Sequence, residues 1–515
     1  MQSAGRYVLA VDLGTSGPKV ALVGDDGEVA AQTARAVETR RLAPDAAEQD
    51  PEEIWDATIA AILEVVDAAP HAVDGIVGVV CASQFSSIVP VDAAGRPTAD
   101  LILWMTRRGA PYSQRIFETH PESIGRWLEI HGAVPMGNDS LSHMLHVKHD
   151  RPDAFARTHK FLEPVDFLSQ RLTGSFAANP CTAFLMLLTD NRRLDDVDYD
   201  SDLLRFSGID REKLPDLVPV DACLGTLRPE VARELGLPAA TPVFTGMNDT
   251  QAATIGAGAF RPGRGGFNVG TTMQVLASAA KKDTDIASQI VSMPSPLPGD
   301  YLALSEIGLG GKALEHFLRV VVHPNDRLGD HSAPDPFAAL DAAVEAEPAG
   351  SGGALFLPWL TGAIAPNENP RMRGAFLNLS LDTTRPRMLR AVLEGLAYHL
   401  RWMTEPAERF AGARFEEICF SGGGAQSDAW AQILADVTDR PVSQLAEARQ
   451  VNTRGAAFLV FHRLGLARLE DAERFRPIRR VYEPRAASRR VYDELFEQFV
   501  ASFERVRPIC EALNT

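Results

Sequence analysis

The sequence predicts an α/β protein of two similar domains, and three observations support this prediction. First, 515 residues are too many for a single hydrophobic core. Second, short apolar strands alternate with helical segments, which is typical of layered α/β folds. Third, a strand, a G-T-[ST] turn and a second strand occur near the N-terminus and again near residue 265. We expect one domain over residues 1–252 and another over 253–515.

Composition and charge exclude several classes of protein. The formal net charge of −17 is spread along the chain, so we expect no nucleic-acid partner. No stretch is apolar over the length that a bilayer requires, so we expect no membrane association. The chain opens directly into a strand, and we expect no signal peptide. The five cysteines form no CxxC pair, so we expect reduced thiols in a cytoplasmic protein and no zinc site: Cys81, Cys181, Cys223, Cys419 and Cys510.

The first half begins with strands and continues into alternating elements. Apolar runs at 7–14, 19–24 and 28–37 predict an antiparallel meander. A helix follows over 50–69, with Asp50 as its N-cap and Pro51 at its first position. Further strands are expected at 75–83, 86–95 and 242–246. Helices are expected before Gly174, which caps one of them, and from residue 249, near the expected domain boundary.

The second half repeats this pattern. Residues 265–279 read as a strand, a Gly-Thr-Thr turn and a strand, a weaker form of the N-terminal hairpin. Residues 416–444 read as a strand, a glycine turn, a helix and a strand. Two halves that each open with the same hairpin predict an internal duplication. Two similar lobes leave a cleft between them, where ligands commonly bind.

Three glycine-containing turns have the composition of anion-binding loops: "DLGTSG", "NVGTTM" and "SGGGAQS". Such loops present backbone N–H groups and hydroxyls to an anion, and the last turn adds the N-terminus of a helix. A single loop of this kind is equally well explained by an ordinary hairpin, whereas three favour phosphate binding. Asp12 at a strand end suits a hydrated Mg²⁺. There is no GxxxxGK[ST] motif, so a P-loop is excluded.

The order of several motifs resembles one known family. The relevant segments are "AVDLGTSGPKVALVGDDGEV", "EQDPEEIWDATIAAI", "FLEPVDFLSQRLTG", "PVFTGMNDTQAATIGAGA", "NVGTTM", "LPWLTG" with "RGAF" and "RAVLEGLA", and "FSGGGAQSDAWAQILADVTDRPV". Together they are similar to the FGGY carbohydrate kinases, which include xylulose, gluconate and glycerol kinases. The resemblance implies a two-domain actin-like ATPase fold of the ribonuclease H-like kind, with an interdomain cleft. It further implies a sugar-binding N-terminal domain that carries the catalytic base, and a nucleotide-binding C-terminal domain.

The resemblance also implies the cofactors and the catalytic residues. ATP and Mg²⁺ would be the cofactors, with Asp12 and Asp249 on the metal side. Asp249 in "GMNDTQ" would be the base that accepts the proton of the attacking hydroxyl. The structural alternative is that Asp249 only caps a helix, which its position also suits. Thr250 would contact a substrate hydroxyl, and Asn248 stands where the family often has glycine, which implies a narrower pocket.

The residues implied to face the nucleotide come from both domains. The first domain would contribute Gly14, Thr15, Ser16 and Lys19. The second would contribute Gly270, Thr271, Thr272, Gly311, Glu315, Gly423, Gly424 and Asp428. Lys19 and Glu315 are equally compatible with solvated positions. Asn452 is a further candidate on the adenine side.

The sugar-binding side departs from the family pattern. Gln84-Phe85-Ser86 replaces the family's Gln-Met-His or Gln-Arg-Glu, and Thr106 replaces the aspartate of W-x-D-x-R. The expected substrate-binding residues are Gln84, Phe85, Trp104, Arg108, Asp139, Asp249 and Thr250. Surface or structural roles remain open for Arg108 and Asp139, and a core role remains open for Trp104. A sugar acid such as gluconate would need a cationic pocket, for which Arg107, Arg108 and His143 are candidates.

The expected function is an ATP-dependent sugar kinase. It would transfer the γ-phosphoryl group to a hydroxyl of a small sugar, ketose or polyol and be most similar to a xylulokinase. The alternatives are a sugar-sensing pseudokinase without turnover, a kinase for another polyol or sugar acid, and a filament-forming ATPase of the same fold. Many members of the family are dimers, so a homodimer is an expectation by analogy.

Overall fold

The computed structural model describes residues 5–514, which form two compact units. Unit 1 contains the chain up to Gly256 together with Ser292–Leu302 and Gln450–Arg476. Unit 2 contains Ala257–Val291, Ala303–Arg449 and the chain from Pro477 onward. The two later segments of unit 1 were not part of the expected division at residue 252.

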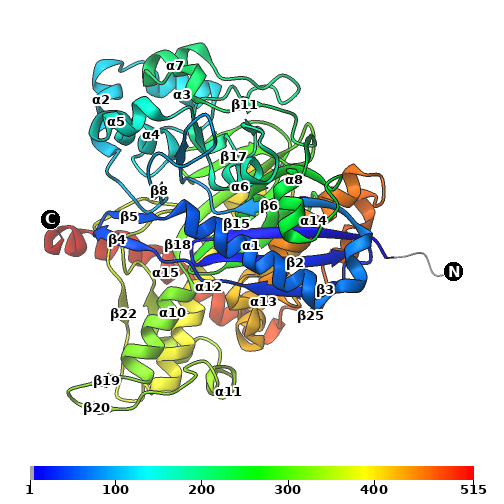
Figure 1. The fold of residues 1–515 in the computed structure, drawn as a ribbon. Helices are drawn as coiled ribbons and strands as arrows, with labels where there is room; N and C mark the ends of the chain where they lie inside the picture. The colour runs from blue at the N-terminus through cyan, green and yellow to red at the C-terminus, as the bar shows by residue number, and fades with distance from the viewer. Residues whose placement is uncertain (1–4, 515) are drawn as a thin grey trace. The chain divides into compact units, whose positions relative to one another are not determined.

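Unit 1 is built on a six-stranded mixed sheet (Figure 1). The spatial order of its strands is β12-β13-β6-β1-β2-β3. The antiparallel meander predicted at the N-terminus pairs β1 with β2 and β2 with β3, whereas β6 runs parallel to both β1 and β13. The strands are β1 (Tyr7–Gly14), β2 (Gly17–Gly24), β3 (Val29–Ala34), β6 (Ile76–Ser83), β12 (Cys223–Thr226) and β13 (Pro242–Asn248).

The main core of unit 1 lies between this sheet and helices α1 (Pro51–Ala68), α6 (Pro164–Thr173) and α8 (Pro229–Leu235). Helix α1 begins as predicted, because Asp50 accepts a hydrogen bond from the Glu52 N–H at 2.9 Å and Pro51 occupies the first position. Figure 1 shows α1 crossing the strand layer over β2 and β3, with which it packs. Helix α6 ends at Gly174, whose φ of 87° closes it as predicted.

On the other side of the sheet, α9 (Asp249–Gly256) and α14 (Val451–Arg463) pack against each other and against β1 and β6. Their backbones approach closely at two glycines. A Cβ at Gly455 would lie 2.3 Å from the carbonyl oxygen of Ala252, and one at Gly256 would lie 1.9 Å from that of Val451. The absence of side chains at these positions therefore allows the two helices to meet.

A second hydrophobic core holds the helical part of unit 1. It surrounds Trp127 and Phe206 and is formed by α2 (Ala110–Thr119), α3 (Ser123–Ile130), α4 (Ser140–Asp150), α5 (Pro152–Arg157) and α7 (Ser201–Ser207). Short strands flank this core: β4 (Arg40–Ala43), β5 (Ala46–Gln49), β7 (Val89–Val91), β8 (Leu101–Ile102), β9 (Lys160–Leu162), β10 (Ala177–Ala178) and β11 (Asp216–Leu217).

Unit 2 contains an eight-stranded sheet in the order β16-β17-β18-β15-β14-β23-β24-β25. Strand β14 pairs antiparallel with β15 and parallel with β23, and β23 pairs parallel with β24. The strands are β14 (Arg264–Val269), β15 (Thr272–Ala279), β16 (Thr284–Asp285), β17 (Ile290–Pro294), β18 (Tyr301–Leu309), β23 (Glu417–Ser421), β24 (Val442–Leu445) and β25 (Ile478–Tyr482). Residues 292–294 of β17 and 301–302 of β18 group with unit 1.

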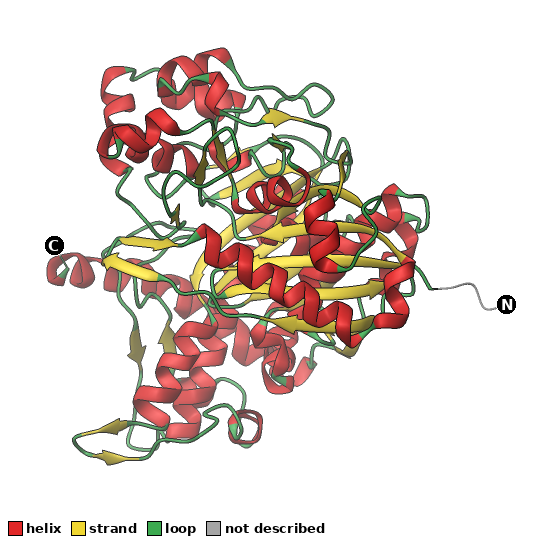
Figure 2. Cartoon of the chain, in the orientation of Figure 1, coloured by secondary structure: helices red, strands yellow, loops and turns green. Residues whose placement is uncertain are grey.

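Long helices cover the sheet of unit 2, and Figure 2 shows helices packed against the strands. Helix α12 packs against α13, β15 and β21. The remaining elements are α10 (Gly311–Phe317), α11 (Leu340–Glu345), α12 (Arg385–Ala411), α13 (Asp428–Thr438), α15 (Ala486–Leu513), and short strands β19 (Asn325–Asp326), β20 (Gly329–Asp330), β21 (Leu355–Leu357) and β22 (Ala375–Leu377).

The strand orders confirm the predicted duplication. The order β3-β2-β1-β6-β13 in unit 1 matches the order β18-β15-β14-β23-β24 in unit 2. The directions agree as well: the first hairpin is antiparallel in each unit, and the next two strands pair parallel. Because parallel strands end at one edge of their sheet, each unit collects the residues after three strands at a single edge.

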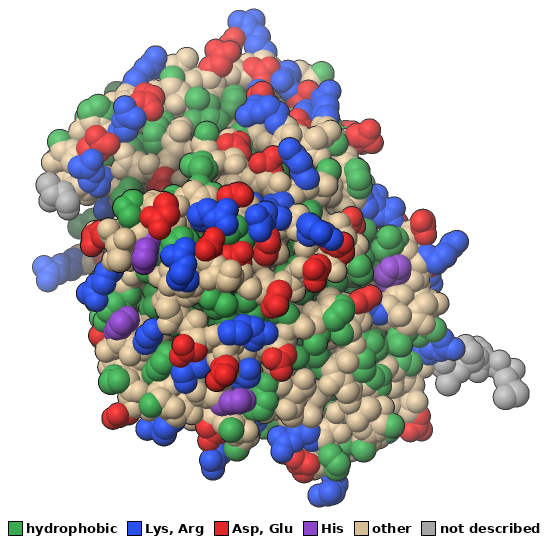
Figure 3. Space-filling model, turned by 90° about the horizontal axis from the view of Figure 1, so that it is seen from above, with side chains coloured by type: hydrophobic (Ala, Val, Ile, Leu, Met, Phe, Trp, Pro, Cys, Tyr) green, Lys and Arg blue, Asp and Glu red, His purple; other side chains and the backbone are tan. Residues whose placement is uncertain are grey.

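The distribution of charge on one face and the hydrophobicity of the helices can be read from the structure. On the face shown in Figure 3, acidic and basic side chains are interspersed. Within residues 5–514, no helix combines the length and the hydrophobicity needed to cross a bilayer.

Candidate active site

The edge of the unit 1 sheet places two aspartates at the ends of parallel strands. Asp12 near the end of β1 is level with Ala82 of β6, which is level with Met247 of β13. Asp249 follows two residues after Met247, at the start of α9. With strands about 4.8 Å apart, the backbones of Asp12 and Met247 lie about 10 Å from each other. The two aspartates therefore belong to one edge.

Asp12 is a buried carboxylate with partners on both oxygens. Its side chain is 2 % exposed, and Oδ2 accepts a hydrogen bond from Lys19 Nζ at 3.0 Å. Oδ1 accepts one from Asn452 Nδ2, at the start of α14, at 3.2 Å. Asn452, expected on the adenine side, thus lies beside Asp12 in unit 1. Lys19 is 41 % exposed and held by an ion pair, so it is neither fully solvated nor directed away from this edge.

The turn after β1 is shaped by Gly17. Its φ is 123°, and a Cβ there would lie 2.2 Å from the Arg35 carbonyl oxygen. Gly14 pairs with Gly17, so Thr15 and Ser16 form the tip of the hairpin. Ser16 is exposed, whereas the Thr15 hydroxyl turns inward. The expected phosphate-binding turn is present, but the Thr15 hydroxyl has other partners.

A directional chain of hydrogen bonds fixes the side chains next to this turn. Trp104 Nε1 donates to Thr15 Oγ1 at 3.0 Å, and Thr15 Oγ1 donates to Gln84 Oε1 at 2.6 Å. Gln84 Nε2 donates to Gln49 Oε1 at 3.3 Å, and Gln49 Nε2 donates to the Thr15 carbonyl at 2.7 Å. The structure thus brings the expected residues Gln84, Trp104 and Thr15 together. It adds Gln49, which was not predicted. In the sequence this residue is marked only by its position directly before Asp50, the cap of α1.

Asp249 is not the cap of α9. The cap is Asn248, whose Oδ1 accepts from the Gln251 N–H at 2.8 Å while Gln251 Oε1 accepts from the Asn248 N–H at 3.0 Å. This reciprocal pair is a capping box, in which Asn248 is the N-cap residue. Asp249 is half-buried at the first position of the helix, and its Oδ1 accepts from the Thr250 N–H at 2.8 Å. Capping of α9 therefore does not explain the aspartate at position 249.

Two other expected substrate-binding residues have structural partners. Asp139 caps α4: its oxygens accept from the N–H groups of Ser142, Met136 and Gly137 at 2.7–3.0 Å. Burial raises the pKa of Asp139. Arg108 bonds the buried Glu48, which Arg151 also bonds, yet the buried Arg108 Nε makes no hydrogen bond to any described group. Arg108 therefore has one unpaired donor, which is buried, whereas both oxygens of Asp139 accept hydrogen bonds.

The departures around Gln84 and Trp104 have structural explanations. The Thr106 hydroxyl donates to the Ala47 carbonyl at 3.0 Å and accepts from the Ala47 N–H at 3.1 Å, so it anchors β5. Ser86, with φ of 61°, donates to the Asn138 carbonyl at 2.6 Å and accepts from His143 Nε2 through its own carbonyl at 3.1 Å. Phe85 is half-buried.

His143 does not supply the cation suggested for a sugar acid. It is fully buried, and burial lowers its pKa to about 3, so the imidazole is neutral near pH 7. Arg108 is neutralised in part by Glu48, and Arg107 is exposed with one bond to the Met136 carbonyl at 3.4 Å. His143 is thus excluded as a cation and Arg108 shares the Glu48 carboxylate with Arg151, whereas Arg107 bonds a carbonyl and keeps its charge.

Unit 2 has a cavity of about 530 Å³ at the corresponding edge of its sheet. Six expected nucleotide residues line it: Gly270, Thr271, Gly311, Glu315, Gly423 and Gly424. The turns approach closely, since Gly311 N–H donates to the Gly270 carbonyl at 2.8 Å and Gly310 N–H to that of Thr271 at 3.0 Å. One side of the cavity is therefore backbone-rich.

The other residues that line this cavity are both apolar and polar, and they were not predicted from the sequence. Leu314, Phe337, Ala338, Leu340 and Trp430 line it, together with the polar Lys312, Asp335, Asp341, Gln426, Ser427 and Arg449. Glu315 bonds Lys312 and Arg319, and the hydrogen bond from Lys312 is the main reason that its pKa is lowered. Lys312 could have been predicted from the sequence because it follows Gly311 in a family motif. Phe337 and Arg449 belong to no motif.

Two expected nucleotide residues lie away from the walls of this cavity. The Thr272 hydroxyl is hydrogen-bonded with Glu306, whose pKa is raised by burial. Asp428 lines a different cavity, and its carboxylate accepts from Arg479 and from Gln444 Nε2 at 3.0 Å. Its backbone N–H donates to Asp341 Oδ2 at 2.9 Å, which ties it indirectly to the nucleotide cavity.

The donor set at Asp12 fits Mg²⁺. Among the described residues, no group of three or more His, Cys, Asp or Glu side chains is placed to hold a metal ion by itself. Mg²⁺ usually needs no such group, because it keeps several waters and binds one or two carboxylates plus phosphate oxygens. A single buried carboxylate beside a lysine at a strand end meets that requirement.

Comparison with known proteins assigns the family. Models of the FGGY family of carbohydrate kinases match residues 7–256 (N-terminal domain) and 266–464 (C-terminal domain). Xylulose kinase of Bacillus subtilis is 28% identical over 99% of both chains, and gluconokinase of the same organism is 25% identical over 89% of this chain and 88% of its own. A crystal structure of a "xyloylose kinase" from Brucella ovis matches with a TM-score of 0.87 and 25% identity, covering 98% of this chain and 100% of that one. These matches confirm the expected two-domain actin-like ATPase fold, and the chain belongs to the FGGY family of carbohydrate kinases.

Proposed function

We propose that this carbohydrate kinase transfers the γ-phosphoryl group of ATP to a hydroxyl of a small neutral ketose or polyol, as a xylulose kinase does. The observation that carries the proposal is Asp249, a half-buried carboxylate at the active edge whose capping role is taken by Asn248. The names of the relatives, xylulose kinase and gluconokinase, support a sugar substrate.

The choice of a neutral substrate rests on charge. Recognition of a sugar acid needs a cation that is not already paired. His143 is neutral, and Arg108 is bonded to Glu48. The chain Trp104–Thr15–Gln84–Gln49 instead offers a rigid polar surface, which suits hydroxyl and carbonyl groups. A xylulose-like substrate is therefore favoured over gluconate.

The chain's own groups have the following roles. Asp249 accepts the proton as the substrate oxygen forms its bond to the γ-phosphorus and the bond between that phosphorus and the ADP oxygen breaks. Thr250 contacts the substrate, and Arg108 Nε donates to it. Backbone donors of Thr271, Gly423 and Gly424 hold phosphates, while Phe337 and Trp430 contact the base. FGGY kinases use Mg²⁺ with ATP, and Asp12 would hold this ion, which neutralises phosphate charge.

The test is a coupled ADP-release assay with MgATP and a panel of pentuloses, pentitols, hexonates and glycerol. We expect a neutral ketose or polyol to stimulate ADP release and gluconate to be at least tenfold poorer, because His143 is neutral and Arg108 is already bonded to Glu48. Asp249→Asn, which keeps the shape of the side chain, should lower kcat by about 10³-fold and leave ADP binding unchanged.

Two outcomes would refute parts of the proposal. Sugar-dependent turnover by Asp249→Asn at more than a tenth of the wild-type kcat would remove the base assignment, and a hexonate as the best substrate would remove the neutral-substrate assignment. ATP binding without turnover on any member of the panel would favour the sugar-sensing pseudokinase.

A further inference from the structure

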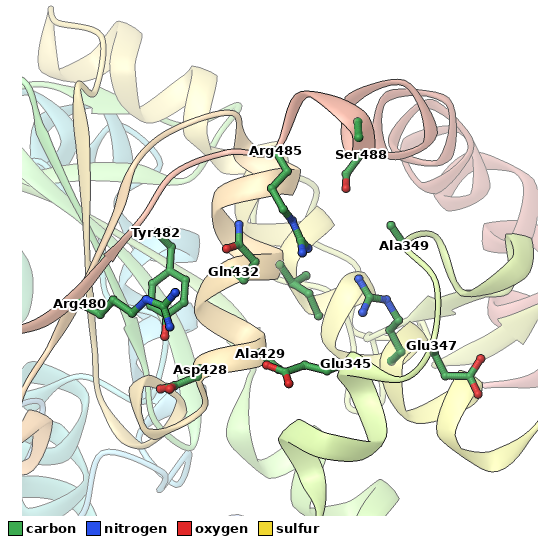
Figure 4. Close-up of a pocket in the computed structure, with 13 residues that line it drawn as sticks. Glu345, Glu347, Ala349, Asp428, Ala429, Gln432, Arg480, Tyr482, Arg485 and Ser488 are labelled. Atoms are coloured by element: carbon green, nitrogen blue, oxygen red, sulfur yellow. The ribbon is translucent and has the colours of Figure 1, made fainter.

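Unit 2 contains a second cavity, separate from the one assigned to the nucleotide. It has a volume of about 570 Å³, within the range of sites for small ligands. Figure 4 shows its walls, which come from the end of α11, from α12, from α13, from β25 and from the start of α15. The residues that line it include Glu345, Gln432, Arg480, Tyr482, Arg485 and Ser488.

Most of the charges around this cavity are already paired. Arg390 donates to Glu394, to Tyr492 and to the Val344 carbonyl. Glu347 accepts from Arg387 at 3.1 Å, and Asp428 accepts from Arg479 at 3.1 Å. These pairs shape the walls and leave little charge for a ligand.

A smaller set of groups is left without partners. Arg480 lies over the Tyr482 ring, with 4.7 Å from its guanidinium carbon to the ring centroid, and pairs with no acidic side chain among residues 5–514. Arg485 bonds Asp436 through Nε and Nη2 at 2.9 and 2.6 Å, which leaves Nη1. In that same part of the chain, no hydrogen bond occupies the Glu345 carboxylate or the Gln432 Oε1.

The hydrogen-bond donors and acceptors that line the cavity come from different walls. In Figure 4, Arg485 reaches into the cavity from the start of α15, and Arg480 stands on β25 beside Tyr482. Glu345 approaches from α11, on the opposite side from Arg485. Gln432 lies between Arg485 and Glu345 in this view, whereas the buried Ser488 lies beyond Arg485, at the start of α15. A ligand in the cavity would thus meet two guanidinium groups from different walls, together with the oxygen acceptors of Glu345, Gln432 and Ser488.

This cavity and the nucleotide cavity are lined by different residues of the same helices. The start of α13 gives Ser427 and Trp430 to the nucleotide cavity and Asp428, Ala429 and Gln432 to the second one. Helix α11 gives Asp341 to the first and Glu345 to the second. Asp341 bonds the Ser427 hydroxyl and the Asp428 N–H. The two cavities are therefore adjacent but distinct.

We propose that this second cavity binds a small phosphorylated polyol, distinct from the nucleotide. Arg480 and Nη1 of Arg485 bind the phosphate, because guanidinium groups match phosphate oxygens in geometry and charge. Glu345, Gln432 Oε1 and Ser488 Oγ accept hydrogen bonds from hydroxyls. Three acceptors of different kinds suit several hydroxyls better than one ammonium group, which would concentrate at the single carboxylate.

Calorimetric titration of the full chain tests the proposal, with ribose 5-phosphate, inorganic phosphate, ribose and glutamate as probes. We expect ribose 5-phosphate to bind at one site in the presence of saturating ADP. Arg480→Ala should lower the affinity for ribose 5-phosphate by about tenfold or more, the typical effect of losing a charge-assisted hydrogen bond. Its ADP affinity should stay within about twofold, since Arg480 does not line the nucleotide cavity.

Glu345→Ala separates the two ends of the ligand. It should weaken ribose 5-phosphate about tenfold by removing a hydroxyl acceptor, and should leave inorganic phosphate unchanged or slightly tighter, because a negative charge is lost. Arg490→Ala is the matched control. Arg490 is 91 % exposed, pairs with Glu494 and lies outside the cavity, so the same change in charge should have no effect.

Three results would overturn the proposal. The first is no binding of ribose 5-phosphate by a protein that binds ADP. The second is binding that ADP displaces and Arg480→Ala does not alter, which would place the phosphate in the nucleotide cavity. The third is tighter binding of glutamate than of ribose 5-phosphate, which would make the site zwitterion-specific. Each is measured without sugar turnover, so failure of the kinase assignment is a separate result.

Discussion

The two units have the same strand order but differ at the edge where their parallel strands end. In unit 1, Asp12 of β1 faces Lys19 of β2 as an ion pair at 3.0 Å. At the equivalent place in unit 2, Asn268 of β14 faces Gln274 of β15, and their amides bond at 3.1 Å. A charged pair in one hairpin is thus a neutral pair in the other.

The next strand shows a second difference. After β6, unit 1 continues with Gln84, whose amide is part of the hydrogen-bond chain with Thr15 and Gln49. After β23, unit 2 continues with Gly422, Gly423 and Gly424, and a cavity opens beside the last two. The two units therefore share a scaffold but differ in the residues at the strand ends. Unit 1 places bonded polar side chains there, and unit 2 places glycines that line a cavity.

The largest expected effect is at Asp249, which has no counterpart among the glycine turns of unit 2. Asp249→Asn removes the proton acceptor, and we expect kcat to fall by about 10³-fold, within the range for general bases. ADP affinity should not change. Asp439→Asn in unit 2, which alters an aspartate at the end of α13, serves as the control and should retain activity. An Asp249→Asn enzyme with more than a tenth of the wild-type kcat would contradict the assignment.

Asp12→Asn makes the hairpin of unit 1 resemble that of unit 2. We expect kcat/KM to fall by about 10²-fold and the Mg²⁺ concentration for half-maximal activity to rise, since an amide is a weaker ligand than a carboxylate. Magnesium titrations of the initial rate measure both. Asn268→Asp places a carboxylate at the equivalent site of unit 2 and should leave the Mg²⁺ requirement unchanged. Equal Mg²⁺ dependence of Asp12→Asn and wild type would rule out this role for Asp12.

Gln49→Leu tests whether the polar chain of unit 1 orders the sugar side. The substitution leaves Gln84 Nε2 and the Thr15 carbonyl without partners, so we expect a loss of about 1–3 kcal/mol in unfolding free energy. The KM for the sugar should rise while the KM for ATP stays constant. Gln49→Glu keeps an acceptor for Gln84 and should recover part of the sugar affinity. Parallel increases of both KM values would mean that Gln49 has only a general structural role.

The smallest expected effect concerns pH. Burial lowers the pKa of His143 in unit 1 to about 3 and that of His399 in unit 2 to about 4. The unfolded chain binds protons at these histidines below about pH 6.5 while the folded protein does not, so stability falls as pH decreases from 6.5. Each histidine contributes up to about 1.4 kcal/mol per pH unit.

Chemical denaturation at pH 7 and pH 5 measures this dependence. His143→Gln should reduce the difference in unfolding free energy between the two pH values, because glutamine does not titrate. His71→Gln, at a histidine outside both cores, serves as the control and should leave the difference unchanged. An unaltered pH dependence in His143→Gln would show that this imidazole protonates in the folded protein.

The sequence by itself determined the periodic features and the motifs. Continuous apolar runs specified the first hairpin, Asp50 and Pro51 specified the start of α1, and Gly174 specified the end of α6, because local backbone preferences decide such features. The repeated G-T-[ST] turn revealed the duplication, and motif order indicated the family. The same motifs predicted Asp249 as the base, which stays a prediction, and six residues that line the cavity of about 530 Å³ in unit 2.

Only the tertiary structure decided which groups meet across long stretches of chain. Asn452 reaches Asp12 across 440 positions, and residues 450–476 join unit 1 although they follow most of unit 2. Gln49, Phe337 and Trp430 became site residues through packing that no local pattern encodes. Asn248, and not Asp249, proved to be the cap because two side chains three residues apart bonded each other's backbone. Hydrogen-bond partners depend on distances that folding creates, whereas strands, turns and caps depend on neighbours in the sequence.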